Sequence, residues 1–362
     1  MSTRILTLVL ITLGALATQP GLGQDLAGST ESQVVALDTQ RGTRPLVYLV
    51  GRLSEEEQAT LAEAAPNVEF LVDLSEEEAL AQAGRIQGAD AHLLTDAFLA
   101  AAHDLRWVQS WSAGVTRYLE REGLRDNDRI VLTNMKGVHG PAIAEHVFAM
   151  LLSLTRDLAA FRKAQDEGEW DRRAGTGLNT LSGRTMLVVG MGGIGSQIAR
   201  RAKGFDMKVL ATVRTARPAP DYCDELGTAA DLDRFLPEAD VVAVALPLTE
   251  ETTDLFDAGK FALMKPGAYF LNVGRGRIVV TDDLLASLDS GHLAGAGLDV
   301  TEPEPLPSDH PLWKSDKVLI TPHVSSHADL TGERRWDVFQ ENIRRFGVGE
   351  PLLNVVDKQL GY

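Results

Sequence analysis

The sequence predicts an α/β fold made of two doubly wound parallel sheets. From residue 45 onward, short and almost wholly apolar runs alternate with helix-length segments. This pattern is typical of parallel strands that are buried on both faces and joined by crossover helices. A turn-rich joint at residues 178–183 separates two such series, and the length of 362 residues suits about two domains.

The first series contains five predicted strands. Ser54, which is followed by three glutamates, indicates a helix start with a serine cap and acids at the positive helix end. Strands are expected at residues 46–50, 68–72, 89–94, 105–111 and 130–133.

A long helix is predicted next, at residues 142–164, because Ile143, Val147 and Leu151 recur on one helical face. Another helix is expected at residues 332–346. Because it follows the second series, it is a candidate to return to the first domain. The strands of the second series are expected at residues 185–189, 208–213, 241–246, 268–273, 295–300 and 317–321.

Charge and cysteine content exclude several classes of partner. The chain has 35 basic and 51 acidic residues, a net charge of −16, so nucleic acids and anionic membranes are not expected partners. Small anionic substrates remain possible, because a local arginine cluster can override the overall field. The single cysteine, Cys223, allows neither an intrachain disulfide nor a zinc cluster, and we interpret it as a spectator thiol. No metal is expected.

The N-terminus resembles an export signal. Arg4 precedes an apolar run at residues 5–17, and small residues at 15–17 have the spacing of a cleavage site. We therefore expect residues 1–24 to be a signal peptide or N-terminal anchor, residues 25–44 to be a disordered lead-in, and the protein to be exported to a bacterial periplasm. The alternatives are an inner-membrane anchor, or a cytoplasmic protein with a wrongly assigned start.

A glycine-rich loop indicates a dinucleotide site. The pattern G-x-G-x-x-G is weak evidence alone, but here a predicted strand leads into it and a predicted helix, residues 196–204, leads out. The first glycine permits a tight turn, the second admits the pyrophosphate, and the third lets helix and strand pack closely. A plain structural turn is the alternative. The residues expected at the cofactor are Gly190, Gly192, Gly193, Ile194 and Gly195.

The next strand bears on the choice of cofactor. It ends at Val213, where an NAD site usually has an acid that accepts from the ribose 2′-hydroxyl. Arg214, Thr215 and Arg217 follow instead, and guanidinium groups suit a 2′-phosphate. We therefore predict that NADP is preferred over NAD. The alternative is that both arginines are ordinary surface residues.

Three ionisable residues follow predicted strands of the second series, namely Arg275, Glu304 and His323. Ligands of open parallel sheets bind outside the carboxyl ends of the strands, so all three could face one crevice. A histidine can protonate a carbonyl oxygen, a neighbouring carboxylate fixes the imidazole tautomer, and an arginine clamps a substrate carboxylate. Each residue alone also has an ordinary structural or surface explanation.

Taken together, these motifs resemble the D-isomer-specific 2-hydroxyacid dehydrogenase family, in the family's order over residues 45–362. The resemblance implies a Rossmann cofactor domain at 142–324, inserted in a smaller flavodoxin-like substrate domain at 45–141 and 325–362. The matching stretches are residues 111–115, 143–146, 190–195, 246–249, 272–276, 298–300, 304–305 and 321–323.

The resemblance also assigns roles and a quaternary state. Backbone amides around Ser112, Ala113 and Gly114 would bind the substrate carboxylate together with Arg275, and Asp299 would hold the nicotinamide amide. A homodimer is expected. Thr301, Ser325 and Ser326 depart from common family choices, which puts the substrate preference in doubt. Further residues expected at the cofactor are Pro247, Thr253, Val273 and Gly274.

The sequence therefore predicts hydride transfer between NAD(P)H and a small 2-oxo acid, such as glyoxylate or hydroxypyruvate, to give a D-2-hydroxy acid. His323 would be the general acid in reduction and the general base in oxidation. The main alternative is a binding protein that senses NAD(P)H or a 2-oxo acid without turnover. A methyltransferase that uses the glycine loop is a weaker one.

Overall fold

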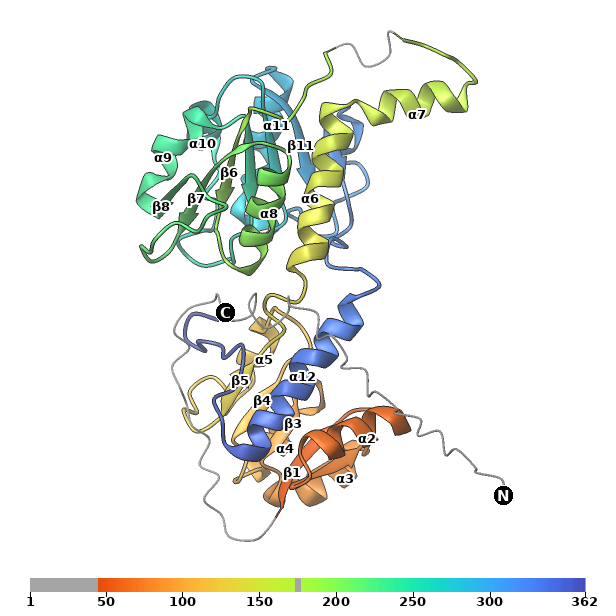
Figure 1. The fold of residues 1–362 in the computed structure, drawn as a ribbon, viewed down its shortest axis with the longest axis vertical. Helices are drawn as coiled ribbons and strands as arrows, with labels where there is room; N and C mark the ends of the chain where they lie inside the picture. Colours follow the sequence, from red (N-terminus) through yellow and green to blue (C-terminus); the bar gives the residue numbers. More distant parts are fainter. Residues whose placement is uncertain (1–44, 173–176, 362) are drawn as a thin grey trace, which may run out of the picture. The chain divides into compact units, whose positions relative to one another are not determined.

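The computed structural model of the chain describes residues 45–172 and 177–361, whose strands form two all-parallel sheets (Figure 1). The strand order is β2-β1-β3-β4-β5 in one sheet and β12-β11-β10-β9-β6-β7-β8 in the other. These are the flavodoxin-like and Rossmann orders, so the predicted fold class is confirmed. The expected signal segment and lead-in lie outside the described residues, and the domain boundaries stay predictions.

The first sheet follows from its local sequence. Ser54 and Ser75 both form capping boxes, which start the helices α2 and α3. Strand β3 is shorter than predicted, because the chain enters a 3₁₀ turn at Ala91–Leu93. The elements are β1 (Leu46–Val50), α2 (Glu55–Ala64), β2 (Val68–Val72), α3 (Glu76–Gln82), β3 (Gly88–Asp90), α4 (Asp96–Ala101), β4 (Trp107–Gln109), α5 (Thr116–Leu119) and β5 (Val131–Thr133).

The C-terminal helix α12 (Thr331–Val348) packs on this first sheet. The ring of Phe346 lies 6.3 Å from that of Tyr48 and 5.1 Å from that of Trp107. The side chain of Asn342 donates to Gln109 Oε1 on β4 at 3.0 Å. The segment after α12 also returns to this sheet, since Val356 N donates to Leu132 O at 2.8 Å.

The second sheet has an apolar cluster on each face. Strand β8 was not predicted, because this short edge strand is only half-buried and lacks an apolar run. The elements are β6 (Thr185–Val189), α8 (Gly193–Gly204), β7 (Lys208–Val213), β8 (Glu225–Thr228), α9 (Leu232–Phe235), β9 (Val241–Val244), α10 (Ala258–Leu263), β10 (Ala268–Asn272), α11 (Thr281–Asp289), β11 (Leu293–Leu298) and β12 (Val318–Ile320).

The predicted long helix is in fact two helices, α6 (Gly140–Thr155) and α7 (Leu158–Asp166). Asp157 lies between them in the left-handed region, with φ of 50°, which ends the regular helix. Helix α6 packs on the second sheet, where Gly297 of β11 leaves room for Met150. No helix among residues 45–172 and 177–361 has the length and apolar character needed to span a bilayer.

The approach of α8 to β6 gives a stability prediction. A Cβ on Gly195 would lie 2.2 Å from the carbonyl oxygen of Gly190, so Gly195→Ala should force the helix away from the strand. We expect a loss of about 1–3 kcal/mol in the free energy of unfolding, measured by urea denaturation.

The matched control is Gly204→Ala in the last turn of the same helix, where a Cβ would have no neighbour within 4 Å. It should be neutral or stabilising by up to about 1 kcal/mol. Equal unfolding midpoints for the two variants would contradict the packing explanation.

Candidate active site

The predicted site residues lie in loops at the carboxyl end of the second sheet. One row of paired residues across its strands marks this end. The loop with Arg275 leaves β10, the segment with Glu304 leaves β11, and the loop with His323 leaves β12. These three strands are neighbours, so adjacent loops start only about 4.8 Å apart. The row consists of Thr212, Val189, Val244, Asn272, Leu298 and Ile320.

His323 and Glu304 form the predicted pair. The imidazole Nδ1 lies 2.7 Å from Glu304 Oε1, and the two side chains are 45% and 42% exposed. With the carboxylate accepting at Nδ1, the neutral imidazole carries that proton and leaves Nε2 for a reactant. The backbone of His323 is in the left-handed region, at φ of 55°. Such strain in a non-glycine residue is often found at functional sites.

The buried carboxylate of Asp299 holds the loop that carries His323. It accepts hydrogen bonds from Thr321 Oγ1 at 2.7 Å, Val324 N at 2.9 Å and Ser325 N at 3.1 Å. The Asp299 carbonyl accepts from His323 N at 2.8 Å. Asp299 therefore positions His323, a role that the sequence did not indicate.

His146 on α6 supports the same loop. Its Nε2 lies 2.9 Å from Thr321 Oγ1 and 3.8 Å from Asp299 Oδ1. These contacts give His146 a supporting role beneath the loop.

Arg275 lies beside the carboxylate cradle, the backbone amides of Ser112, Ala113 and Gly114 that are predicted to bind the substrate carboxylate. Its Nη1 donates to Gly274 O at 2.7 Å, and its Nη2 lies 3.3 Å from where a Cβ on Gly114 would be. The cradle itself is smaller than expected, because Ser112 N already donates to Ser110 Oγ at 3.1 Å. Among the described residues, the amides of Ala113 and Gly114 have no recorded acceptor and remain for a ligand.

The glycine loop fits a dinucleotide. Gly190 has φ of 95° and a Cβ there would lie 2.8 Å from the Leu246 side chain, so only glycine suits the turn. A Cβ on Gly192 would meet no atom of the chain within 4 Å, which leaves its surface open to a ligand. Helix α8 begins at Gly193, earlier than predicted, and its first-turn amides, including those of Ile194 and Gly195, are free for phosphate oxygens.

The loops after β9 and β10 lie against this turn. A Cβ on Gly274 would be 2.7 Å from Leu246 O, and Val273 N donates to Val244 O at 3.1 Å. Thr253 Oγ1 donates to Thr249 O at 2.7 Å, while Pro247 O accepts from the neighbouring Thr252 Oγ1 at 2.8 Å. The residues expected to flank the cofactor thus belong to one ordered surface beside the glycine loop.

The end of β7 carries the three residues predicted for the ribose. Arg214, Thr215 and Arg217 are all exposed, and Arg217 Nη2 donates to Met191 O in the glycine loop at 2.9 Å. Lys136, which the sequence analysis did not single out, lies near enough to Arg214 to be affected by its charge. Burial, followed by the positive charge of Arg214, lowers the pKa of Lys136. No pattern in the sequence brings this residue, far back in the chain, to the end of β7.

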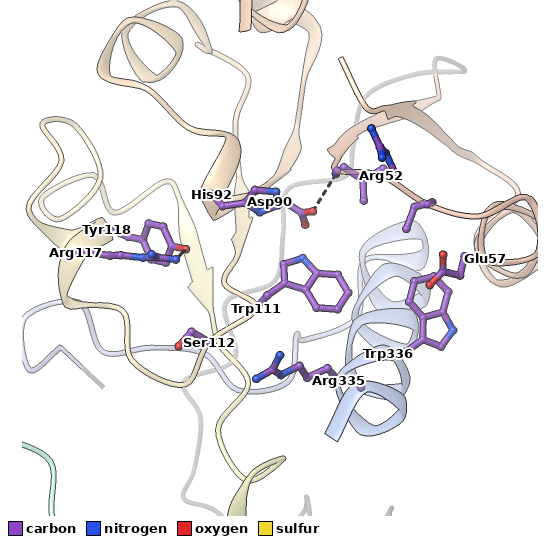
Figure 2. A pocket seen from close by; sticks show the side chains of 14 residues that line it. Arg52, Glu57, Asp90, His92, Trp111, Ser112, Arg117, Tyr118, Arg335 and Trp336 are labelled. Carbon is purple, nitrogen blue, oxygen red and sulfur yellow. Dashed lines mark hydrogen bonds between the residues drawn. The ribbon is translucent and has the colours of Figure 1, made fainter. Parts of the chain in front are cut away.

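A pocket of about 590 Å³ lies at the ends of β1, β3 and β4, with α12 as one wall (Figure 2). Its wall includes the buried Asp90, which accepts from Tyr48 OH at 2.9 Å and Gly51 N at 3.2 Å. Burial raises the pKa of Asp90. Among the residues that line the pocket, the sequence had singled out only Trp111 and Ser112. Arg335 and Trp336 of α12 were missed, because a helix of alternating polar and apolar residues looks like an ordinary surface helix.

Two observations concern metals and the thiol. Within the part of the chain that the structure describes, no group of three or more His, Cys, Asp or Glu residues could hold a metal ion. Cys223 is buried, and burial raises the pKa of its thiol, which suits a spectator.

Comparison with known proteins agrees with this geometry. Residues 148–325 match the family described as D-isomer specific 2-hydroxyacid dehydrogenase, NAD binding domain. The chain is similar to a glyoxylate reductase of Korarchaeum cryptofilum, with 36% identity over 287 residues that cover 76% of this chain and 85% of that protein.

Two solved structures are similar over most of the chain. One is a D-isomer specific 2-hydroxyacid dehydrogenase family protein from Aeromonas salmonicida, with 36% identity, a TM-score of 0.71, and coverage of 87% of this chain and 99% of that one. The other is an NADPH-dependent glyoxylate/hydroxypyruvate reductase from Sinorhizobium meliloti in complex with NADP and sulfate, with 31% identity, a TM-score of 0.69, and coverage of 88% and 100%.

The Rossmann sheet, its glycine loop and the histidine–carboxylate pair at the same edge define a nicotinamide-dependent oxidoreductase. The relatives specify it further: the chain belongs to the D-isomer specific 2-hydroxyacid dehydrogenase family.

The Asp299 network gives a second prediction. In Asp299→Asn one carboxylate oxygen becomes an NH₂ group, which cannot accept from the amides of the His323 loop. We expect a loss of about 1–3 kcal/mol in unfolding free energy, measured by urea denaturation, because a buried donor is left unpaired. Asp289→Asn at the exposed end of α11 is the control and should stay within about 0.5 kcal/mol of wild type. Similar values for both variants would show that the network does not hold the loop.

Proposed function

We propose that the protein reduces a 2-oxo acid to the corresponding D-2-hydroxy acid, with NADPH as the preferred reductant. The observation that carries this proposal is the 2.7 Å contact between His323 Nδ1 and Glu304 Oε1, made at the same sheet edge as the glycine loop. Proton donor and dinucleotide site are therefore built on one rigid sheet. A sensor of cofactor or substrate, the alternative function, has no use for such a pair.

The chemistry divides between cofactor and chain. When bound, the nicotinamide supplies a hydride to the carbonyl carbon. Arg275 and the amides of Ala113 and Gly114 hold the substrate carboxylate, which orients the carbonyl and favours negative charge on its oxygen. In reduction the doubly protonated ring of His323 gives its Nε2 proton to that oxygen and becomes neutral. Glu304, which accepts from Nδ1, offsets the positive charge of the ring before the transfer. In oxidation His323 takes the proton back, so hydride and proton balance in both directions.

A single product configuration follows from fixed anchors in this proposal, and the family to which the chain belongs favours the D form. The carboxylate is held by Arg275 and the carbonyl oxygen faces His323, so the remaining substituent has one place left. The carbonyl then presents a single face to the nicotinamide. This inference is also consistent with the family to which the chain belongs.

The preference for NADPH rests on charge at the end of β7. Val213 cannot accept a hydrogen bond from a ribose hydroxyl, whereas Arg214 and Arg217 can pair with a 2′-phosphate. Lys136, whose pKa is lowered by burial and then by the positive charge of Arg214, adds a further cation near this end that a phosphate would stabilise.

The catalytic assignment is tested by His323→Ala. Without the proton donor, kcat with glyoxylate or hydroxypyruvate should fall by about 10²- to 10⁴-fold, while the dissociation constant for NADPH stays the same. Turnover is followed by the absorbance of reduced cofactor, and binding by its fluorescence. His103→Ala is the control, because His103 is exposed on the first domain and should leave both quantities unchanged. Near-normal kcat in His323→Ala would refute the role, and wild-type binding of NADPH without turnover of any 2-oxo acid would favour the sensor.

The cofactor assignment is tested by the double variant Arg214→Ala/Arg217→Ala. Loss of the phosphate contacts should raise KM for NADPH by roughly 10- to 100-fold and leave KM for NADH nearly constant. Arg234→Ala, an exposed arginine bound to Glu225 and Asp231, is the matched control. An equal rise in KM for NADPH and NADH would mean that the two arginines stabilise the loop and do not bind the 2′-phosphate.

A further inference from the structure

The pocket at the ends of β1, β3 and β4 is too large for a two-carbon substrate. Its volume of about 590 Å³ falls in the roughly 300–1,000 Å³ range of sites that enclose drug-sized ligands. Ser112, at the start of the carboxylate cradle, is part of its wall. A substrate whose carboxylate lies on the cradle could therefore extend its remaining carbons into this space.

Arg335 supplies a partly buried guanidinium with one unsatisfied donor in this wall. Its Nε is buried and has no hydrogen-bond partner among the described residues. Figure 2 shows its guanidinium reaching from α12 toward Trp111 and Ser112. A buried guanidinium donor without a partner is costly, and a carboxylate is the group that pairs with it best.

A neighbouring imidazole also has a buried nitrogen without a hydrogen-bond partner. His139, the N-cap residue of α6, has a buried Nδ1 that also lacks a partner among the described residues. Burial, followed by the positive charge of Arg335, lowers the pKa of His139 to about 4. His139 therefore stays neutral near pH 7 and does not repel an anion, but it cannot neutralise Arg335 either.

The other charged residues of the wall have partners of their own, and Glu57 accepts from Ser54 N at 2.7 Å in the capping box of α2. Arg52 pairs with Asp73 at 3.2 Å, and Arg117 lies over the ring of Tyr118 at 4.5 Å. The pKa of Asp90 is raised by burial, and its oxygens already accept from Tyr48 and Gly51.

The start of α12 adds a favourable field. Gly332 in its first turn lines the pocket, which places the positive end of an 18-residue helix at the wall.

We propose that this pocket receives the part of the 2-oxo acid beyond the reacting carbonyl, and that Arg335 selects substrates that carry a second carboxylate there. The preferred substrates would then be dicarboxylic 2-oxo acids rather than glyoxylate. This inference rests on the proposed reduction of a 2-oxo acid. It names Arg335 as a specificity-determining residue that acts through a charge-assisted hydrogen bond.

The experiment compares two acids of similar length that differ in the charge of the tail. 2-Oxoglutarate ends in a carboxylate and 2-oxohexanoate ends in an alkyl group. With saturating NADPH, the wild-type kcat/KM should favour 2-oxoglutarate by at least about 10-fold. In Arg335→Gln this ratio should fall by about 10- to 100-fold, mainly through KM for the diacid.

Two further variants separate specificity from structure. Arg335→Lys keeps the charge but not the two-pronged geometry, so its ratio should lie between those of wild type and Arg335→Gln. Arg334→Gln, on the same helix but not in the pocket wall, should keep the wild-type ratio. A purely structural role for Arg335 would lower the melting temperature and slow both acids alike, which would overturn the proposal.

Assays of the wild-type enzyme alone also distinguish failure of the pocket assignment from failure of the proposed function. If it turns over 2-oxohexanoate or glyoxylate but shows no preference for 2-oxoglutarate, the pocket assignment is wrong and the proposed function stands. If no 2-oxo acid of the panel oxidises NADPH, the proposed function itself fails.

Discussion

The shared register of the parallel strands is the constraint on which the site depends. Strands β10, β11 and β12 end level with one another, through the pairs Asn272–Leu298 and Leu298–Ile320. Since side chains alternate along a strand, a slip of one residue would turn every side chain of that strand to the opposite face. Close packing helps to fix the register. A Cβ on Gly276 would lie 1.8 Å from Thr301 O, so the arginine loop and the segment leading to Glu304 fit together only with glycine there.

The proposed catalytic pair is exposed, and its order comes from buried neighbours. His323 and Glu304 gain little from a single solvent-exposed ion pair. The strained backbone at His323 is kept in place by Asp299, whose carboxylate is 1% exposed and binds the following two amides. Through Thr321 and His146, the same network reaches α6. Precision at the reactive imidazole is thus supplied by hydrogen bonds one layer below the surface, where water cannot compete for them.

The sequence predicts this molecule well where the structure is set by local pattern. Strands β1, β6 and β7 have their predicted limits, because each is an apolar run bounded by turn residues. The proposed catalytic residues could be selected from the sequence because each lies within about six residues of the end of a predicted strand. Features set by tertiary contact were missed: the break at Asp157 lies inside a continuous helical pattern, and Lys136 reaches Arg214 only through the fold. Arg335 was missed for the same reason, since its burial depends on how α12 lies against the first sheet.

The overall acidity of the chain and its basic ligand sites are compatible. A net charge of −16 repels anions at long range, yet charges beyond about 8 Å are largely screened at physiological ionic strength. What an anionic substrate meets at contact distance is Arg275 beside the cradle and, if it carries a second carboxylate, Arg335 in the pocket. Two acids lie in that wall. Glu57 accepts from the backbone amide of Ser54, and because burial raises the pKa of Asp90, Asp90 opposes the substrate less than an exposed carboxylate would. In the proposed function, selectivity for anions therefore rests on a few guanidinium groups at contact distance, of which Arg275 is exposed and Arg335 partly buried, and the surface charge contributes to solubility instead.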